Sequence, residues 1–224
     1  LFRFVASEEV AEFPVVRSSV IEAFLKGLAP HLGFVKKIGA DYFFHPWLGP
    51  IVQKIARRSL SNDRGLAAVL SNTVSPTMLQ AGYKMNVIPA EAFASIDCRI
   101  MPGETPGHFR GEIQRIVGDR VNVTLEVGSV PNESDWKTGY FRLIEKALKR
   151  QDREAVVLPM MSAGATDSRY FRAKGTIAYG IIPLLLPPEE LSGLHGKNER
   201  IPLEGLERGA EVLYEIVQGV QDLP

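Results

Sequence analysis

The chain has 224 residues, 45% of them apolar and 23% charged, a composition typical of a globular protein with one or two domains and a sizeable core. Its 26 basic and 26 acidic residues give a formal net charge of zero, which argues against a nucleic-acid partner. The single cysteine, Cys98, excludes an intrachain disulfide, and no apolar run reaches the roughly 18 residues of a membrane span.

The first part of the sequence predicts helices. A serine pair can cap a helix over 18–30, which ends at a proline. A second helix is expected from Pro50, because Ile51 and Ile55 follow at helical spacing. The polar stretch 59–65 is typical of a loop.

Further along, the apolar period changes to that of a strand. In 92–101, Ile96, Cys98 and Ile100 alternate with polar residues, which predicts a half-buried strand with one polar face. Residues 75–87 predict its hairpin partner, with the letters IPAE at the turn.

A helix and a third strand are expected next. Thr105 can cap a helix over 105–118, Pro106 suits its first position, and Gly118 suits its end. The stretch 121–127 predicts the third strand. Two strands, a helix and a strand indicate a small α+β layer.

The remainder of the chain predicts an α/β layer. Small and polar residues at 128–135 indicate a domain boundary. Helices are expected over 138–151 and 201–217, the second with Leu206, Ala210, Leu213 and Val217 on one apolar stripe. Short buried strands are expected at 155–160 and 176–181.

Three clusters of residues could carry chemistry. The first is His195, which lies in the glycine-flanked loop SGLHGKNERI. Neutral imidazole is a common metal ligand, and a loop in an α/β layer is a place where such ligands gather. The alternative is a surface histidine in a turn, because no second histidine or cysteine lies at ligand spacing.

The second cluster is the run SAGATDSRYF at 162–171, where backbone N–H groups at a helix start could hold an anion. The alternative is a tight connection with Thr166 or Asp167 as N-cap. In the third cluster, Arg99 could bind a carboxylate and Asn86 lies at the other end of the hairpin. The alternative is a solvated Arg99 paired with Asp97.

The ordered motifs TMLQAGYKMNVIP, IDCRIMPGET, GATDSRYF and GLHGKNERI resemble those of the zinc-dependent aminoacylase and carboxypeptidase family. That family includes carboxypeptidase S, aminoacylase and succinyl-diaminopimelate desuccinylase, and the carboxypeptidase S and N-fatty-acyl-amino-acid hydrolase branch is the most similar. The resemblance extends over roughly residues 40–217. It implies an α/β, two-domain metallopeptidase, with a small α+β lid (dimerisation) domain over 1–128. The C-terminal part of the α/β catalytic domain would then occupy 129–224.

The resemblance also implies roles for individual residues. Two zinc ions act with a glutamate general base in the family, and His195 matches the last metal ligand. Asn86 and Arg99 match positions that bind the carboxylate end of the substrate. Gly164 and Thr166 match the loop that lines the substrate pocket, and Glu199 matches an acidic position that supports the ligand.

The other family ligands are an HxD motif, a bridging aspartate and a Glu-Glu pair that includes the base, and none occurs in the expected setting. The pair Glu8–Glu9 precedes a helix of the wrong kind and has no aspartate partner. We therefore expect the chain to be the C-terminal half of the enzyme, without the first strand of its lid, inactive alone and unable to bind zinc tightly. A non-catalytic dimerisation or interaction module derived from the family is the alternative. A cytoplasmic location is expected, or a secreted or vacuolar one if a signal precedes the sequence.

Geometry adds one expectation about assembly. If IPAE is the turn, Arg99 lies about 26 Å along the returning strand, at roughly 3.3 Å per residue. Asn86 and Arg99 then cannot bind the same small substrate, a peptide or N-acyl amino acid, within one chain. We expect a homodimer through the lid, with Asn86 acting on the partner's site and Arg99 on its own.

Overall fold

The computed structural model describes most of the chain, which divides into two compact units. One unit comprises residues 1–133 with 160–169, and the other comprises 134–159 with 170–224. For residues 57–60 the backbone alone is described. The described residues are 13–60, 69–126, 128–162, 164–184, 186, 190, 193 and 196–223.

The first unit begins with helices, as its sequence predicts. Helix α2 spans Ser19–Leu28, and the hydroxyl of Ser18 accepts the N–H of Ile21 at 3.2 Å, which satisfies one of the free donors of the first turn. A short 3-10 helix, η1, follows over Ala29–His31. The helix predicted over 18–30 is therefore confirmed.

Helix α3, Phe34–Tyr42, was not predicted, whereas α4, Gly49–Leu60, begins one residue before the expected Pro50. The ring nitrogen Nδ1 of His45 accepts the backbone N–H groups of Trp47 and Leu48, each at 3.3 Å, just before α4. These bonds form a turn that leads the chain into α4.

One of two apolar clusters in the first unit joins these helices to distant segments. Its buried members are Ile21, Phe43, Leu70 and Met101, with Val52 of α4 packed against them. Asn72 is also buried, and its side-chain oxygen accepts the N–H of Met101 at 2.8 Å.

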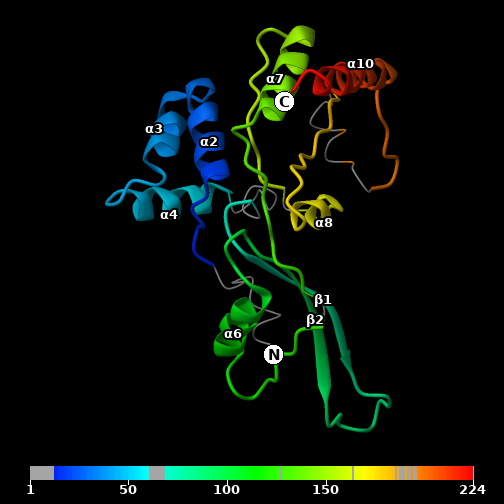
Figure 1. The fold of residues 1–224 in the computed structure, drawn as a ribbon. Helices are drawn as coiled ribbons and strands as arrows, with labels where there is room; N and C mark the ends of the chain where they lie inside the picture. Colours follow the sequence, from blue (N-terminus) through cyan, green and yellow to red (C-terminus); the bar gives the residue numbers. More distant parts are fainter. Residues whose placement is uncertain are drawn as a thin grey trace. The chain divides into compact units, whose positions relative to one another are not determined.

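Strands β1, Thr73–Ala81, and β2, Ala92–Arg99, form an antiparallel hairpin, the two-stranded sheet of the described residues (Figure 1). The prediction that Ile96, Cys98 and Ile100 face inward is confirmed. They pack against a second apolar cluster of Phe13, Val74, Phe109 and Ile113.

The first strand of the hairpin is shorter than the predicted 75–87. It ends at Ala81 because Gly82 turns the chain with φ +73°, a conformation that L side chains rarely adopt. A bulge lies between Pro76 and Met78. Proline has no N–H for the ladder, so an irregularity is expected beside it.

Helix α6, Pro106–Val117, follows the prediction closely. The hydroxyl of Thr105 accepts the N–H of His108 at 3.2 Å, and Gly118 ends the helix with φ +74°. The third strand predicted at 121–127 is wrong for the described residues 121–126. The side chain of Gln114 bonds the carbonyl of Val121 at 2.7 Å and the N–H of Val123 at 3.0 Å, so a helix side chain satisfies these backbone groups instead of a strand.

In the second unit, α7, Gly139–Gln151, packs against α10, Leu203–Val220 (Figure 1). Both helices were predicted. Arg150 of α7 pairs with Glu215 of α10 at 3.1 Å. Glycine allows close packing, since a Cβ at Gly219 would lie 2.5 Å from Cδ1 of Leu143.

The predicted apolar stripe of α10 does not face the interior. Leu206, Leu213 and Val217 are 51%, 44% and 63% exposed, whereas the buried residues of α10 are Gly205, Gly209 and Val212. The helix approaches its neighbours so closely that glycines occupy the contact face, and the larger side chains point outward.

The strands predicted at 155–160 and 176–181 are also wrong, because the described backbone forms no ladder there. Side chains bond the second stretch instead. Arg172 donates from Nη2 to the carbonyl of Ala178 at 2.8 Å, and the N–H of Ala178 donates to the hydroxyl of Ser134 at 3.0 Å. Arg172 belongs to a short helix, α8, over Ser168–Arg172.

Across the described parts of the chain, no helix has both the length and the apolar character that crossing a membrane requires.

Candidate functional site

The structure places the two predicted carboxylate-binding residues at opposite ends of one hairpin. Arg99 is paired with Thr73 at the open end, whereas Asn86 is exposed in the loop between β1 and β2. Arg99 is seven residues from Ala92, where β2 begins, so the strand separates the two ends by about 23 Å at roughly 3.3 Å per residue. A small substrate cannot contact both side chains of one chain.

Arg99 is held by its neighbour on the polar face of β2. Its Nε lies 2.8 Å from a carboxylate oxygen of Asp97, and the two side chains are 44% and 48% exposed. This pair is the arrangement that the simpler interpretation of the sequence expects. It keeps the guanidinium at the surface, where a carboxylate ligand would compete with Asp97.

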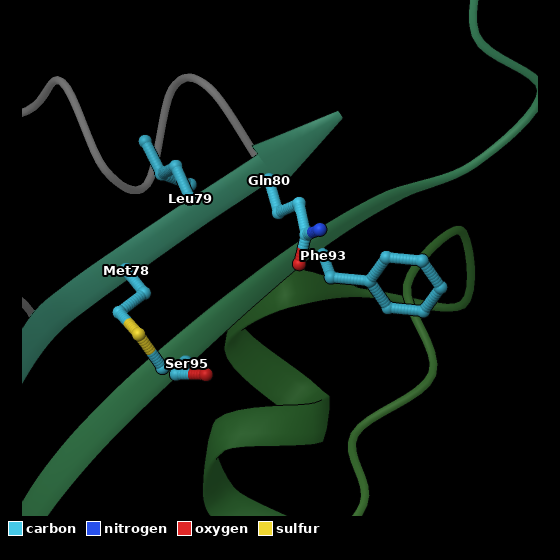
Figure 2. A pocket seen from close by; sticks show the side chains of 5 residues that line it. All are labelled: Met78, Leu79, Gln80, Phe93 and Ser95. Atoms are coloured by element: carbon cyan, nitrogen blue, oxygen red, sulfur yellow. The ribbon is translucent and has the colours of Figure 1, made fainter. Parts of the chain in front are cut away.

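The two strands carry an open hollow near the end where the loop joins them. Figure 2 shows the side chains that line it, with Met78 beside Ser95 and Gln80 beside Phe93, as the strand pairing requires. Met78 and Phe93 are 65% and 62% exposed. Paired residues share a face of a sheet, so Met78 and Phe93 lie exposed on one face of the hairpin.

The loop with the predicted pocket residues Gly164 and Thr166 is exposed. The N–H of Gly164 donates to the hydroxyl of Ser162 at 3.1 Å, and the carbonyl of Thr166 accepts the N–H of Arg169 at 3.3 Å. These contacts hold a tight turn before α8.

His195, the predicted metal ligand, lies outside the described residues, but the segments on both sides of it are described in part. Glu190 and Arg200 form an ion pair with Nε–O distances of 2.8 and 2.9 Å. The N–H of Gly196 donates to the carbonyl of Gly193 at 2.9 Å. Glu199, the predicted supporting residue, is exposed in this segment.

The Glu190–Arg200 pair joins one residue before the histidine with one after it. Sequence reasoning missed this pair because the two residues are ten positions apart. The loop also turns at Asn198, whose φ of +62° is the left-handed conformation that asparagine tolerates better than most residues.

A second group of potential metal ligands lies on α6. Single ligand atoms of Glu104, His108 and Glu112 all lie within 4.8 Å of one another. Nδ1 of His108 is 2.8 Å from a carboxylate oxygen of Glu104, and this oxygen also accepts the N–H of Thr105 at 2.8 Å. Through these bonds Glu104 and His108 take part in the N-terminal cap of α6. The spacing of four residues between successive members of the group is the signal for possible metal ligands that sequence reasoning missed.

The described residues do not provide the ligands of a two-zinc centre at the motif positions. Zinc prefers imidazole, thiolate and carboxylate ligands, and each ion of a two-metal site needs several of them. Within the histidine motif GLHGKNERI, Glu199 is the described carboxylate. The group beside α6 shares Glu104 with the motif IDCRIMPGET, whereas His108 and Glu112 lie outside the four motifs.

Cys98 is the sole cysteine and lies on the inward face of β2. Burial raises the pKa of its thiol, and the negative charge of Asp97 raises it further. A thiol with a raised pKa is a poor nucleophile at neutral pH, so Cys98 acts in packing.

Comparison with known proteins shows what the chain is similar to. Residues 46–124, which include the hairpin and α6, match the family described as "Peptidase dimerisation domain". The chain is 30% identical over 181 residues to N-fatty-acyl-amino acid synthase/hydrolase PM20D1 of Homo sapiens, a match that covers 78% of this chain and 35% of that protein. It is 26% identical over 185 residues to Probable carboxypeptidase S-like 2 of Dictyostelium discoideum, with coverages of 80% and 34%.

Two further matches concern an aminoacylase and a solved structure. Aminoacylase-1 of Mus musculus is 28% identical over 174 residues, which cover 75% of this chain and 41% of that protein. The crystal structure of the M20 family metallo-carboxypeptidase Sso-CP2 from Sulfolobus solfataricus has a TM-score of 0.53 and 16% identity, and the match covers 95% of this chain and 47% of that one.

The chain thus spans between 34% and 41% of the length of these curated relatives. The fold class expected from the motifs is confirmed by the structural match, which covers both units. The predicted resemblance to the aminoacylase and carboxypeptidase family of metallopeptidases is likewise confirmed, with residues 46–124 matching its dimerisation domain.

Proposed function

We propose that this chain forms part of a zinc-dependent amidohydrolase, which cleaves the amide bond of a peptide or N-acyl amino acid beside a free carboxylate. The names of the relatives support this reaction class, since they include a carboxypeptidase, an aminoacylase and an N-fatty-acyl-amino acid hydrolase. The observation that carries the proposal is the placement of Asn86 and Arg99 at opposite ends of the hairpin.

Arg99 and Asn86 would recognise the carboxylate end of the substrate. A guanidinium can form two parallel hydrogen bonds with a carboxylate, and the substrate would replace Asp97 as the partner of Arg99. The exposed amide of Asn86 can donate to the same kind of group. Gly164 and Thr166 would line the pocket, and Glu199 would support the metal ligand His195.

We propose that two chains pair through the dimerisation domain, so that Asn86 completes the partner's site while Arg99 serves its own. The match to the peptidase dimerisation domain supports the pairing. The exposed Met78 and Phe93 of the hairpin provide apolar surface for it. Twofold symmetry then brings the loop of one hairpin to the site of the other chain.

The shared site is tested by complementation in the metal-loaded enzyme that contains these residues. Asn86→Ala and Arg99→Ala should each abolish most activity. Dimers mixed from the two variants keep one intact site, so an equal mixture should recover about a quarter of wild-type activity. No recovery, with mixed dimers shown by mass spectrometry, would mean that both residues serve one site and would overturn the shared arrangement.

Zinc and the inactivity of the 224-residue chain are tested separately. The metal should not bind tightly, because the sequence lacks the other ligands of the family. We therefore expect no release of amino acid from N-acyl amino acids by this chain with added Zn²⁺. Zinc-dependent hydrolysis by the chain alone would refute this expectation. An enzyme that contains these residues, dimerises and has no hydrolase activity would instead establish a non-catalytic dimerisation module.

A further inference from the structure

Helix α3 exposes apolar side chains along one face. Phe34, Val35, Ile38 and Tyr42 are 79%, 80%, 43% and 41% exposed. At 100° per residue these four positions fall within about 100° of the helix circumference, so they form one stripe. The helix has no buried residue, and a stripe of four large apolar side chains therefore faces solvent.

The entry to α4 and its outer face continue the pattern. Trp47 is 84% exposed, and Ile51 and Ile55, one helical turn apart, are 60% and 61% exposed. The inward side of the same helix is accounted for, because Val52 and Ala56 pack against the apolar cluster of the first unit. Exposed apolar groups of this size mark surfaces that bind something.

The charge around these side chains indicates what they bind. Residues 29–60 contain five basic residues and one acidic residue, a formal net charge of 5 − 1 = +4 in a chain whose total is zero. Lys36, Lys37 and Lys54 are exposed on the two helices. The cations and the apolar stripe therefore lie on the same short stretch of chain.

Helix α10 shows that exposed apolar side chains alone do not identify the kind of surface that a helix binds. Its outward side chains include Leu213 and Tyr214, 44% and 67% exposed. Residues 201–220, however, contain four acidic residues and one basic residue, a formal net charge of 1 − 4 = −3. An anionic surface would attract the segment of α3 and α4 and repel α10.

We propose that α3 and α4 bind the surface of a bilayer that contains anionic lipids. Tryptophan and phenylalanine are side chains that enter the interface between headgroups and acyl chains, and lysines beside them contact anionic headgroups. Lysine is depleted at protein–protein interfaces, where aromatic residues are enriched. Lys37 and Lys54 each lie about 60° around the helix from an exposed apolar residue, Phe34 and Ile51, and therefore favour a membrane surface over a protein partner. The helices would lie in the interface plane without spanning the bilayer.

The test is sedimentation of the chain with large vesicles of phosphatidylcholine alone or with 30% phosphatidylserine, at about 0.1 M and 0.5 M NaCl, where screening differs strongly. We expect binding to the anionic vesicles at low salt and at least tenfold weaker binding to the neutral vesicles or at high salt. The double variant Phe34→Ser/Trp47→Ser and the charge variant Lys36→Glu/Lys37→Glu should each weaken binding at least tenfold.

The matched control is Leu213→Ser/Tyr214→Ser on α10, which should bind as the wild type does. Circular dichroism shows whether each variant is folded, which is expected because all the substituted side chains are exposed. Three results would overturn the proposal: no sedimentation with anionic vesicles, equal loss in the α10 control, or self-association of the chain that Phe34→Ser/Trp47→Ser abolishes. The last result would assign the surface to a second copy.

Discussion

Gly209 of α10 provides the sharpest test of the packing in the second unit. The helix follows directly on the loop of the histidine motif, so its position fixes one end of that loop. A Cβ added at Gly209 would lie 2.8 Å from the carbonyl oxygen of Pro183 and 2.8 Å from Cδ2 of Leu184. Because one obstacle is backbone, a rotamer change cannot relieve the clash.

Two opposing effects determine the size of the change in Gly209→Ala. Alanine is better than glycine inside a helix by about 1 kcal/mol. Forcing extra volume into a packed contact costs about 1–3 kcal/mol, and a backbone obstacle puts the cost in the upper part of that range. We expect a net loss of about 1–2 kcal/mol in the free energy of unfolding.

The assay is urea unfolding followed by circular dichroism, with two helical glycines as controls. Gly219→Ala meets the flexible end of Leu143 at 2.5 Å, so its loss should be smaller than that of Gly209→Ala. Gly111→Ala of α6 has no atom within 4 Å of the added Cβ and should stabilise by about 0.5–1 kcal/mol. If Gly209→Ala were neutral or stabilising, the close approach of α10 to residues 183–184 would be wrong.

Three further predictions concern a cap, the thiol and an ion pair. Thr138→Ala should lower the free energy of unfolding by about 1–2 kcal/mol, because the hydroxyl of Thr138 accepts the N–H of Phe141 and bonds the hydroxyl of Tyr179; equal urea midpoints would contradict it. The pKa of the Cys98 thiol is raised in the folded chain, so the thiol of the unfolded chain, with a pKa of about 8.5, loses its proton at a lower pH. The free energy of unfolding therefore falls as pH rises from about 8.5 through the pKa of the folded state. Cys98→Ser should remove that part of the slope in urea titrations between about pH 8 and 10, and an unchanged slope would refute it. Arg200→Ala should change global stability by less than about 0.5 kcal/mol, since Arg200 is 73% exposed, but should speed amide exchange at Gly196 at low salt only; a difference that persists at high salt would contradict an electrostatic cause.

Helices and the hairpin could be predicted because their signals are local. Ser18, Thr105 and Thr138 each accept an N–H from the third residue on, as their place before an apolar period indicates. The alternation of Ile96 and Cys98 identified the inward face of β2. These features depend on neighbours within a few positions of the sequence.

The wrong or missed elements have separate physical causes. A strand needs a partner strand, and the stretches 155–160 and 176–181 form no ladder in the described chain although their composition favours strands. The contact face of α10 was misassigned because glycines form it, and they allow a close approach of the neighbouring chain. A stripe of apolar side chains does not predict such a face. The short α3 was missed although its apolar residues follow helical spacing, because it has nine residues, no side-chain cap and an internal glycine, Gly39.

In the candidate site, too, local features could be predicted from the sequence and contacts between distant residues could not. The positions of Asn86 and Arg99 follow from the hairpin, so their separation could be inferred before the structure. The Glu190–Arg200 pair joins residues ten positions apart, and no sequence period indicates such a pair.

The bulge between Pro76 and Met78 affects how β1 can meet other chains. Proline leaves a missing donor in the row of backbone groups, and the extra residue twists the ribbon locally. A strand of a neighbouring molecule could therefore pair with only part of β1, which limits aggregation through the strand edges. The part of β1 beyond the bulge stays available for pairing.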